Sequence, residues 1–151
     1  MAAAYVHPTA VVGEDFKPAP FVIIDAEVVL GDHVITGSFV HIRYGAHIGD
    51  NVLIGDHVTI HDGAVIGAGS VIADGAIIGR RPATALGTSV KDAQFAGAMV
   101  GEKCQIGVHA VVMAGASVAD KVIVGDGVYV AAGSRADSDV AARAFVPSLH
   151  S

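Results

Sequence analysis

An arginine and a histidine in the middle of this chain belong to a series of equally spaced positions. Arg43 precedes His61 by the same interval at which His61 precedes Gly79. A histidine with a near-neutral pKa can take a proton from an attacking amine or hydroxyl, so His61 is the leading candidate for a general base. His41 and His47 are the competing candidates. The alternative for His61 is an exposed turn histidine, and the alternative for His41 and His47 is that they are ordinary polar residues of a subunit interface.

The segment that follows Gly79 concentrates residue types that bind anions. Two adjacent arginines, Arg80 and Arg81, begin it, and a proline, a lysine and several hydroxyl residues follow before residue 99. Guanidinium groups bind phosphate and carboxylate bidentately, and excursions from rigid scaffolds are favoured places for binding residues. We therefore expect Arg43, Arg80 and Arg81 to bind substrate. A solvated surface loop is the alternative.

A strict period of six residues places these side chains. Every sixth residue from Val6 to Ile78 is aliphatic except Pro18 and Thr36, and the period resumes in a new phase after residue 99. Such a period is typical of a parallel β-helix built from hexapeptide repeats. If the aliphatic residue is position one, positions five, six and one form a short strand that alternates in, out, in. Positions two to four then turn the chain.

Three hexads give one coil, so residues three hexads apart are expected to stack. At this interval of three hexads, Arg43, His61 and the start of the loop at 79–99 are expected to stack in one column. We expect a single β-helix domain over 1–151, whose tail at 136–151 forms a cap. Within this cap, Ser138 is expected to begin a short helix that Pro147 follows. The outward position six is apolar in several hexads, which favours self-association. Two flat sides carry these residues: Val11, Val29 and Val65 on one, and Ile35, Leu53 and Val71 on the other.

Composition excludes several classes of function. The net charge of −6 argues against nucleic acid, which favours a basic patch. Mean hydropathy is +0.58, but polar residues interrupt every apolar stretch well short of a membrane span. No signal peptide is evident, so a cytoplasmic location is expected. The one cysteine, Cys104, falls at a small inward position and is expected to be a packed core thiol.

The chain resembles the bacterial nucleotide-sugar N-acyltransferases of the hexapeptide-repeat superfamily. Four segments carry the resemblance from about Ile42 onward: IGDNV (48–52), RRP (80–82), VGEKCQIGVHA (100–110) and VGDGVYVAAGS (124–134). It implies a left-handed, triangular β-helix and a homotrimer with active sites between subunits beside the loop. It also implies acetyl-CoA or another acyl-CoA as co-substrate, a small-molecule acceptor and no metal. On this basis Lys103, Lys121 and Arg135 are candidates for binding the phosphates of coenzyme A.

The resemblance implies direct attack of an amino sugar, or a nucleotide-linked amino sugar, on the thioester, with a histidine as base. Two other functions stay open. A γ-class carbonic anhydrase shares the fold and needs three histidines on zinc, two of them four or five residues apart; His57 and His61 have that spacing. The other alternative is a noncatalytic scaffold subunit.

Overall fold

The computed structural model describes residues 4–82 and 96–147, which form short strands joined by turns. The expectation of one domain over 1–151 stays a prediction. The strands, in chain order, are β1 (Tyr5–Val6), β2 (Val11–Val12), β3 (Lys17–Pro18), β4 (Ile23–Ile24), β5 (Val29–Leu30), β6 (Ile35–Thr36), β7 (His41–Ile42), β8 (His47–Ile48), β9 (Leu53–Ile54), β10 (Thr59–Ile60), β11 (Val65–Ile66), β12 (Val71–Ile72), β13 (Ile77–Arg80), β14 (Met99–Val100), β15 (Gln105–Ile106), β16 (Val111–Met113), β17 (Ser117–Val118), β18 (Ile123–Val124), β19 (Tyr129–Val130), β20 (Arg135–Ala136) and β21 (Phe145–Val146).

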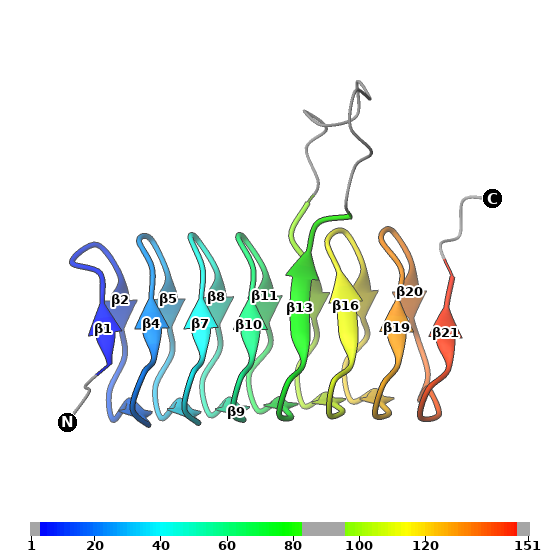
Figure 1. Ribbon diagram of the computed structural model, residues 1–151, viewed down its shortest axis with the longest axis horizontal. Helices are drawn as coiled ribbons and strands as arrows, with labels where there is room; N and C mark the ends of the chain where they lie inside the picture. Colours follow the sequence, from blue (N-terminus) through cyan, green and yellow to red (C-terminus); the bar gives the residue numbers. More distant parts are fainter. Residues whose placement is uncertain (1–3, 83–95, 148–151) are drawn as a thin grey trace, which may run out of the picture.

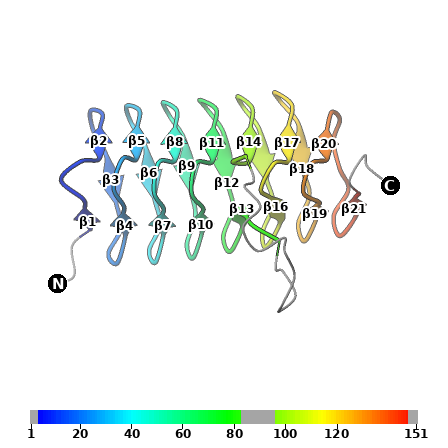
Figure 2. The ribbon, with the colours of Figure 1, turned by 90° about the horizontal axis from the view of Figure 1, so that it is seen from above.

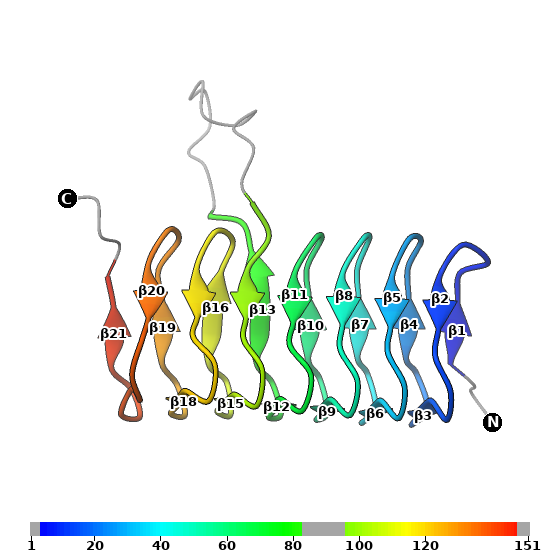
Figure 3. The same cartoon turned by 180° about the vertical axis from the view of Figure 1, so that it is seen from behind.

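The strands form three parallel sheets that wrap around one long axis (Figures 1 and 2). The first sheet has the order β1-β4-β7-β10-β13-β16-β19-β21, and the second has the order β2-β5-β8-β11-β14-β17-β20. The third, β18-β15-β12-β9-β6-β3, runs along the lower edge when the molecule is seen from behind (Figure 3). Successive coils add one strand to each sheet in turn. The predicted all-β, left-handed parallel β-helix is therefore confirmed.

The register follows the predicted interval. Ile24 pairs with Ile42, and Ile42 pairs with Ile60, so each pairing spans three hexads. Across the loop the interval is wider, because Ile66 pairs with Val100. The chain therefore departs from the repeat after β13 and resumes it at β14, and the pairing of β13 with β16 has a register shift between Ile78 and Arg80. This is why the hexapeptide period resumes in a new phase.

The interior is a column of aliphatic side chains contributed by positions one and five of the hexads. Ile42, Ile60 and Ile78 are fully buried. Cys104 is also fully buried, and its thiol donates a hydrogen bond to the carbonyl oxygen of Ala119 over 3.0 Å. Burial raises the pKa of this thiol, so the expected core role is confirmed. Thr36 is the irregular member, since its buried hydroxyl has no hydrogen-bond partner among the described residues.

The predicted helical cap is wrong over residues 136–147, which add further solenoid structure instead. Val140 bridges Val124, and β21 pairs with β19 through Tyr129 and Phe145. In both pairs the interval falls two positions short of three hexads. Because of this shortening, the tail no longer follows the six-residue period, and the periodicity of the sequence therefore did not predict its strands. Residues 148–151 lie outside the described part.

The outer faces of the sheets carry apolar side chains at position six. In the third sheet the predicted row is continuous, since Leu53 lies between Ile35 and Val71. In the second sheet Val11 pairs with Val29, but His47 lies between Val29 and Val65. Within residues 4–82 and 96–147, no helix has the length and apolar character that a bilayer span requires.

Candidate active site

The predicted column lies at the corner between the first and second sheets. We call this corner, with its turns after β7, β10 and β13, the loop corner. The backbone N–H of Arg43 donates to the carbonyl of Ile60 at 2.8 Å, and that of His61 donates to Ile78 at 2.8 Å. Arg43, His61 and Gly79 therefore occupy successive coils. In Figure 1 the chain leaves the solenoid at this corner, just after β13.

These residues surround an open pocket of about 260 Å³. Its lining consists of Arg43, His61, Asp62, Gly79, Arg80 and Arg81. The predicted base and all three predicted substrate-binding arginines thus meet in one place. Residues 83–95, which belong to the predicted loop, lie outside the described part of the chain.

The pocket favours the neutral form of His61. Its pKa is lowered chiefly by burial, and then by the positive charge of Arg43. Asp62 acts in the opposite direction, while Arg80 and His41 lower the pKa further. The Arg43 Nε atom lies 3.4 Å from Asp62 Oδ1, so this carboxylate is already paired with a guanidinium. A neutral imidazole is the form that can accept a proton.

The two competing histidines differ in their surroundings. His41 lies one coil before His61 in the first sheet, and its Nε2 atom is 2.8 Å from Asp25 Oδ2 in a partly buried pair. It is close enough to influence the pKa of His61. His47 instead lies in the second sheet, where it is exposed between Val29 and Val65. Neither of the two belongs to the pocket lining.

The three basic candidates for coenzyme A lie away from this pocket. Lys103 and Lys121 are at the corner between the second and third sheets, where the N–H of Lys121 donates to the carbonyl of Glu102. Arg135 is in β20 and forms an ion pair with Asp137. It lines a separate surface pocket of about 260 Å³ together with Met99 and Ser117.

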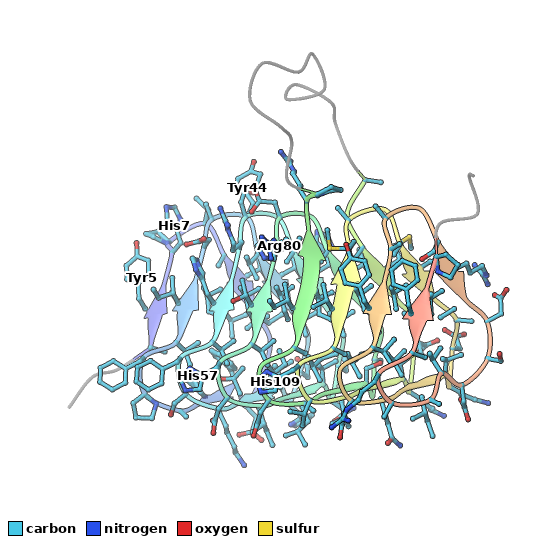
Figure 4. The ribbon with its side chains drawn as sticks, turned by 45° about the vertical axis from the view of Figure 1, so that its right-hand side comes forward. Tyr5, His7, Tyr44, His57, Arg80 and His109 are labelled. Carbon is cyan, nitrogen blue, oxygen red and sulfur yellow. The ribbon has the colours of Figure 1, made fainter. Side chains whose placement is uncertain are left out.

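His57 lies at the corner between the third and first sheets, at the other end of β10 from His61. Its ring stacks on Phe39, with 5.0 Å between centroids and 1° between planes. Figure 4 places His57 and His109 along one edge, and Tyr44 and Arg80 toward the edge where the chain leaves the coil. Within the described ranges, no three His, Cys, Asp or Glu side chains are arranged to hold a metal. His57 and His61 therefore do not converge within one chain.

Sequence reasoning missed three residues near the pocket. Asp25 pairs with His41, Asp62 pairs with Arg43, and Tyr44 is an exposed aromatic residue whose carbonyl accepts from Gly63 in the next coil. The interval of three hexads places Asp25 one coil before Arg43, and Tyr44 one coil before Asp62. The repeat fixes only these backbone positions, so the sequence did not indicate the direction in which each side chain points.

Two family models match the chain. The model described as bacterial transferase hexapeptide (six repeats) matches residues 27–62 and 45–80. The model described as hexapeptide repeat of succinyl-transferase matches residues 97–132. Together these matches span more than half of the 151 residues. The chain belongs to the hexapeptide-repeat superfamily of bacterial transferases, as its sequence pattern predicted.

Solved structures share the fold at low sequence identity. A Bacillus cereus protein assigned as an acetyltransferase has a TM-score of 0.70 and 18% identity, with 93% of this chain and 76% of that chain covered. A hexapeptide transferase family protein from Anaplasma phagocytophilum has a TM-score of 0.56 and 22% identity, with 97% and 71% covered. No curated protein matches the chain by sequence.

A third structure was solved with ligands. It is a histidine-to-alanine variant of GDP-perosamine N-acetyl transferase from Caulobacter crescentus, in complex with CoA and GDP-perosamine. Its TM-score is 0.51 and its identity is 17%, with 95% of this chain covered. This chain spans only 52% of that protein's length.

Proposed function

We propose that this protein is an acyl-CoA-dependent acyltransferase that N-acylates an amino sugar or a nucleotide-linked amino sugar, with His61 as general base. The observation that carries the proposal is the pocket at the loop corner. It holds one half-buried histidine whose pKa is lowered, three arginines, and space for reacting groups. Membership of a transferase superfamily supports the same reaction class.

The reaction needs no covalent enzyme intermediate. The acceptor nitrogen attacks the thioester carbonyl carbon while the His61 imidazole removes a proton from that nitrogen. A backbone N–H stabilises the oxyanion of the tetrahedral intermediate. The carbon–sulfur bond then breaks, and the leaving coenzyme A thiolate takes the proton from the imidazolium. The buried thiol of Cys104 has no part in this sequence.

Acyl-CoA in this proposal lies in a groove between two β-helices of a homotrimer. Lys103, Lys121 and Arg135 are candidates for its phosphates, since guanidinium and ammonium groups bind such anions. The apolar outward rows of the second and third sheets supply surface for the subunit contacts. Sedimentation velocity at several protein concentrations tests the trimer. A cytoplasmic location stays a prediction.

The test of the base is His61→Asn, with His109→Asn as the matched control. His109 occupies a left-handed turn position, with φ of 57°, that asparagine also adopts readily. Coenzyme A release is measured with acetyl-CoA and a panel of free and nucleotide-linked amino sugars. We expect kcat/KM to fall on the order of 10²- to 10⁴-fold in His61→Asn, as for loss of a general base. The thermal unfolding curve and the control's activity should not change.

Full activity of His61→Asn would show that another group is the base, and His41→Asn would then be measured. Stoichiometric zinc with carbon dioxide hydration, lost on replacing His57, would establish the carbonic anhydrase alternative. If calorimetry detects no binding of any acyl-CoA, the scaffold alternative is favoured.

A further inference from the structure

Positive charge is concentrated around His61 to a degree that the whole chain does not share. The protein has a net charge of −6 and only five arginines, of which three line one pocket. The lining contains one carboxylate, Asp62, and that group is paired with Arg43. Arg80 and Arg81 have no carboxylate partner among the described residues. Both positive charges line the pocket beside His61.

The position of the arginines limits which part of a substrate they can meet. This step rests on the proposed function, in which His61 contacts the attacking nitrogen. The pocket must then hold the acyl group, the thioester and the part of the acceptor nearest its amine. The phosphates of coenzyme A are at the far end of the pantetheine arm from the thioester. They cannot occupy the same pocket while the thioester is beside His61.

We infer that one of the two substrates carries a carboxylate or phosphate close to its reacting atom, and that Arg80 and Arg81 bind this group beside His61. The group has two sources: a terminal carboxylate on the acyl chain, or an anionic substituent on the acceptor. The backbone of Arg80 is held in β13, where its carbonyl accepts from the N–H of Ala114 at 2.9 Å. One of the two guanidinium groups therefore starts from a fixed backbone, which reduces the cost of ordering it.

The inferred anion also has an effect on the base. Arg43 and Arg80 both lower the pKa of His61. A bound anion opposes their field, so the pKa of the imidazole should rise when the anionic group binds. The base would then gain affinity for the proton at the time when the nucleophile is in place. This change can be followed by NMR titration of the histidine C–H signals, assigned with His61→Asn.

The kinetic experiment has two arms that separate the sources. In the first, acetyl-CoA and succinyl-CoA are compared with each acceptor of the panel. In the second, neutral amino sugars are compared with their phosphorylated and carboxylated counterparts at a fixed donor. We expect a preference for the charged substrate in one arm, about ten- to a hundredfold in kcat/KM, as for loss of a charged hydrogen bond.

Arg80→Gln and Arg81→Gln test the assignment, with Arg143→Gln as control. Arg143 is exposed in the last described turn, away from the pocket. The two pocket variants should remove the preference by slowing the charged substrate, while Arg143→Gln keeps it. Transfer with no charge preference in either arm would overturn the inference and leave the proposed function standing. So would a preference that survives both pocket variants.

Direct binding separates failure of the inference from failure of the proposed function. Inorganic phosphate and succinate are titrated into the intact protein by calorimetry and by the His61 NMR signal. We expect saturable binding of one of them, weakened about tenfold or more in the Arg80→Gln/Arg81→Gln double variant. If this binding is found while no acyl-CoA is turned over, the anion site stands and the proposed reaction fails. Absence of binding of either anion counts against the site itself.

Discussion

The loop corner and the other two corners use the same repeat position for different purposes. At the other corners, an aspartate at position three accepts a hydrogen bond from the backbone N–H of position three in the preceding coil, at 2.7–2.9 Å. Six aspartates do this: Asp32, Asp50, Asp56, Asp74, Asp120 and Asp126. At the loop corner, Asp62 occupies the same position but pairs with the Arg43 guanidinium.

The residue at position two of the preceding coil explains why Asp62 does not cap a backbone N–H as the other six aspartates do. The capping aspartates face a glycine in the preceding coil, and the fit is close: a Cβ added to Gly55 would lie 2.1 Å from Asp74 Oδ1 and 2.8 Å from its backbone nitrogen. At the loop corner, position two carries the side chains of Arg43 and His61. Glycine therefore lets consecutive coils approach and lock together, whereas a side chain there supplies chemistry. In the coils that carry Arg43 and His61, this position therefore contributes to the pocket and not to the packing of coil on coil.

The strongest test of the comparison is Gly55→Ala. The added methyl group cannot fit unless the next coil moves, so we expect the free energy of unfolding to fall by about 1–3 kcal/mol. The counterpart is Arg43→Ala, which removes a side chain from the same position at the loop corner. Its pair with Asp62 is exposed, so the loss should be about 0–1 kcal/mol. Urea unfolding followed by circular dichroism measures both.

Equal losses for Gly55→Ala and Arg43→Ala would show that the corners are packed alike. In that case the glycines would not explain why the loop corner carries functional side chains.

A pair of aspartate variants tests the same distinction with a smaller effect. Asp74→Ala leaves the N–H of Asp56 without its partner, and we expect a loss of about 1 kcal/mol of stability because the bond is solvent-exposed. Transfer activity should not change. Asp62→Ala removes no backbone cap, so its unfolding midpoint should stay near the parent value while the kinetics of transfer change. Parallel unfolding and activity assays check both expectations. The comparison fails if the two variants show the same pattern.

Much of this architecture could be predicted because the repeat is strict. The three-hexad interval correctly placed Arg43 and His61 on adjacent coils, and an aliphatic period of six predicted the buried column. The tail was missed because a shortened turn puts Val140 and Phe145 out of phase. A prediction based on a six-residue period cannot detect strands that depart from that period.

The candidate site was predicted less completely. The interval of three hexads predicts which backbone positions are neighbours, but it does not predict the direction in which a side chain points. That Asp62 turns to Arg43, or that Asp25 turns to His41, depends on local space and charge. The roles assigned to His61 and to the arginines stay predictions until they are tested by activity.

The smallest expected effect concerns the pH dependence of the reaction. His61 must be neutral to act as base, so the rate should rise with pH through its pKa, which is lowered from the ordinary value of 6.5. The carboxylate of Asp62 raises that pKa, while Arg43 lowers it. Asp62→Asn should therefore move the acidic limb of kcat/KM to lower pH, and Arg43→Gln should move it to higher pH. Asp74→Asn, at another corner, should not move it.

If the acidic limb of the pH profile shifts in the same direction in Asp62→Asn and Arg43→Gln, the titrating group is not His61. Opposite shifts would show that this corner, unlike the other two, uses its aspartate to tune a base.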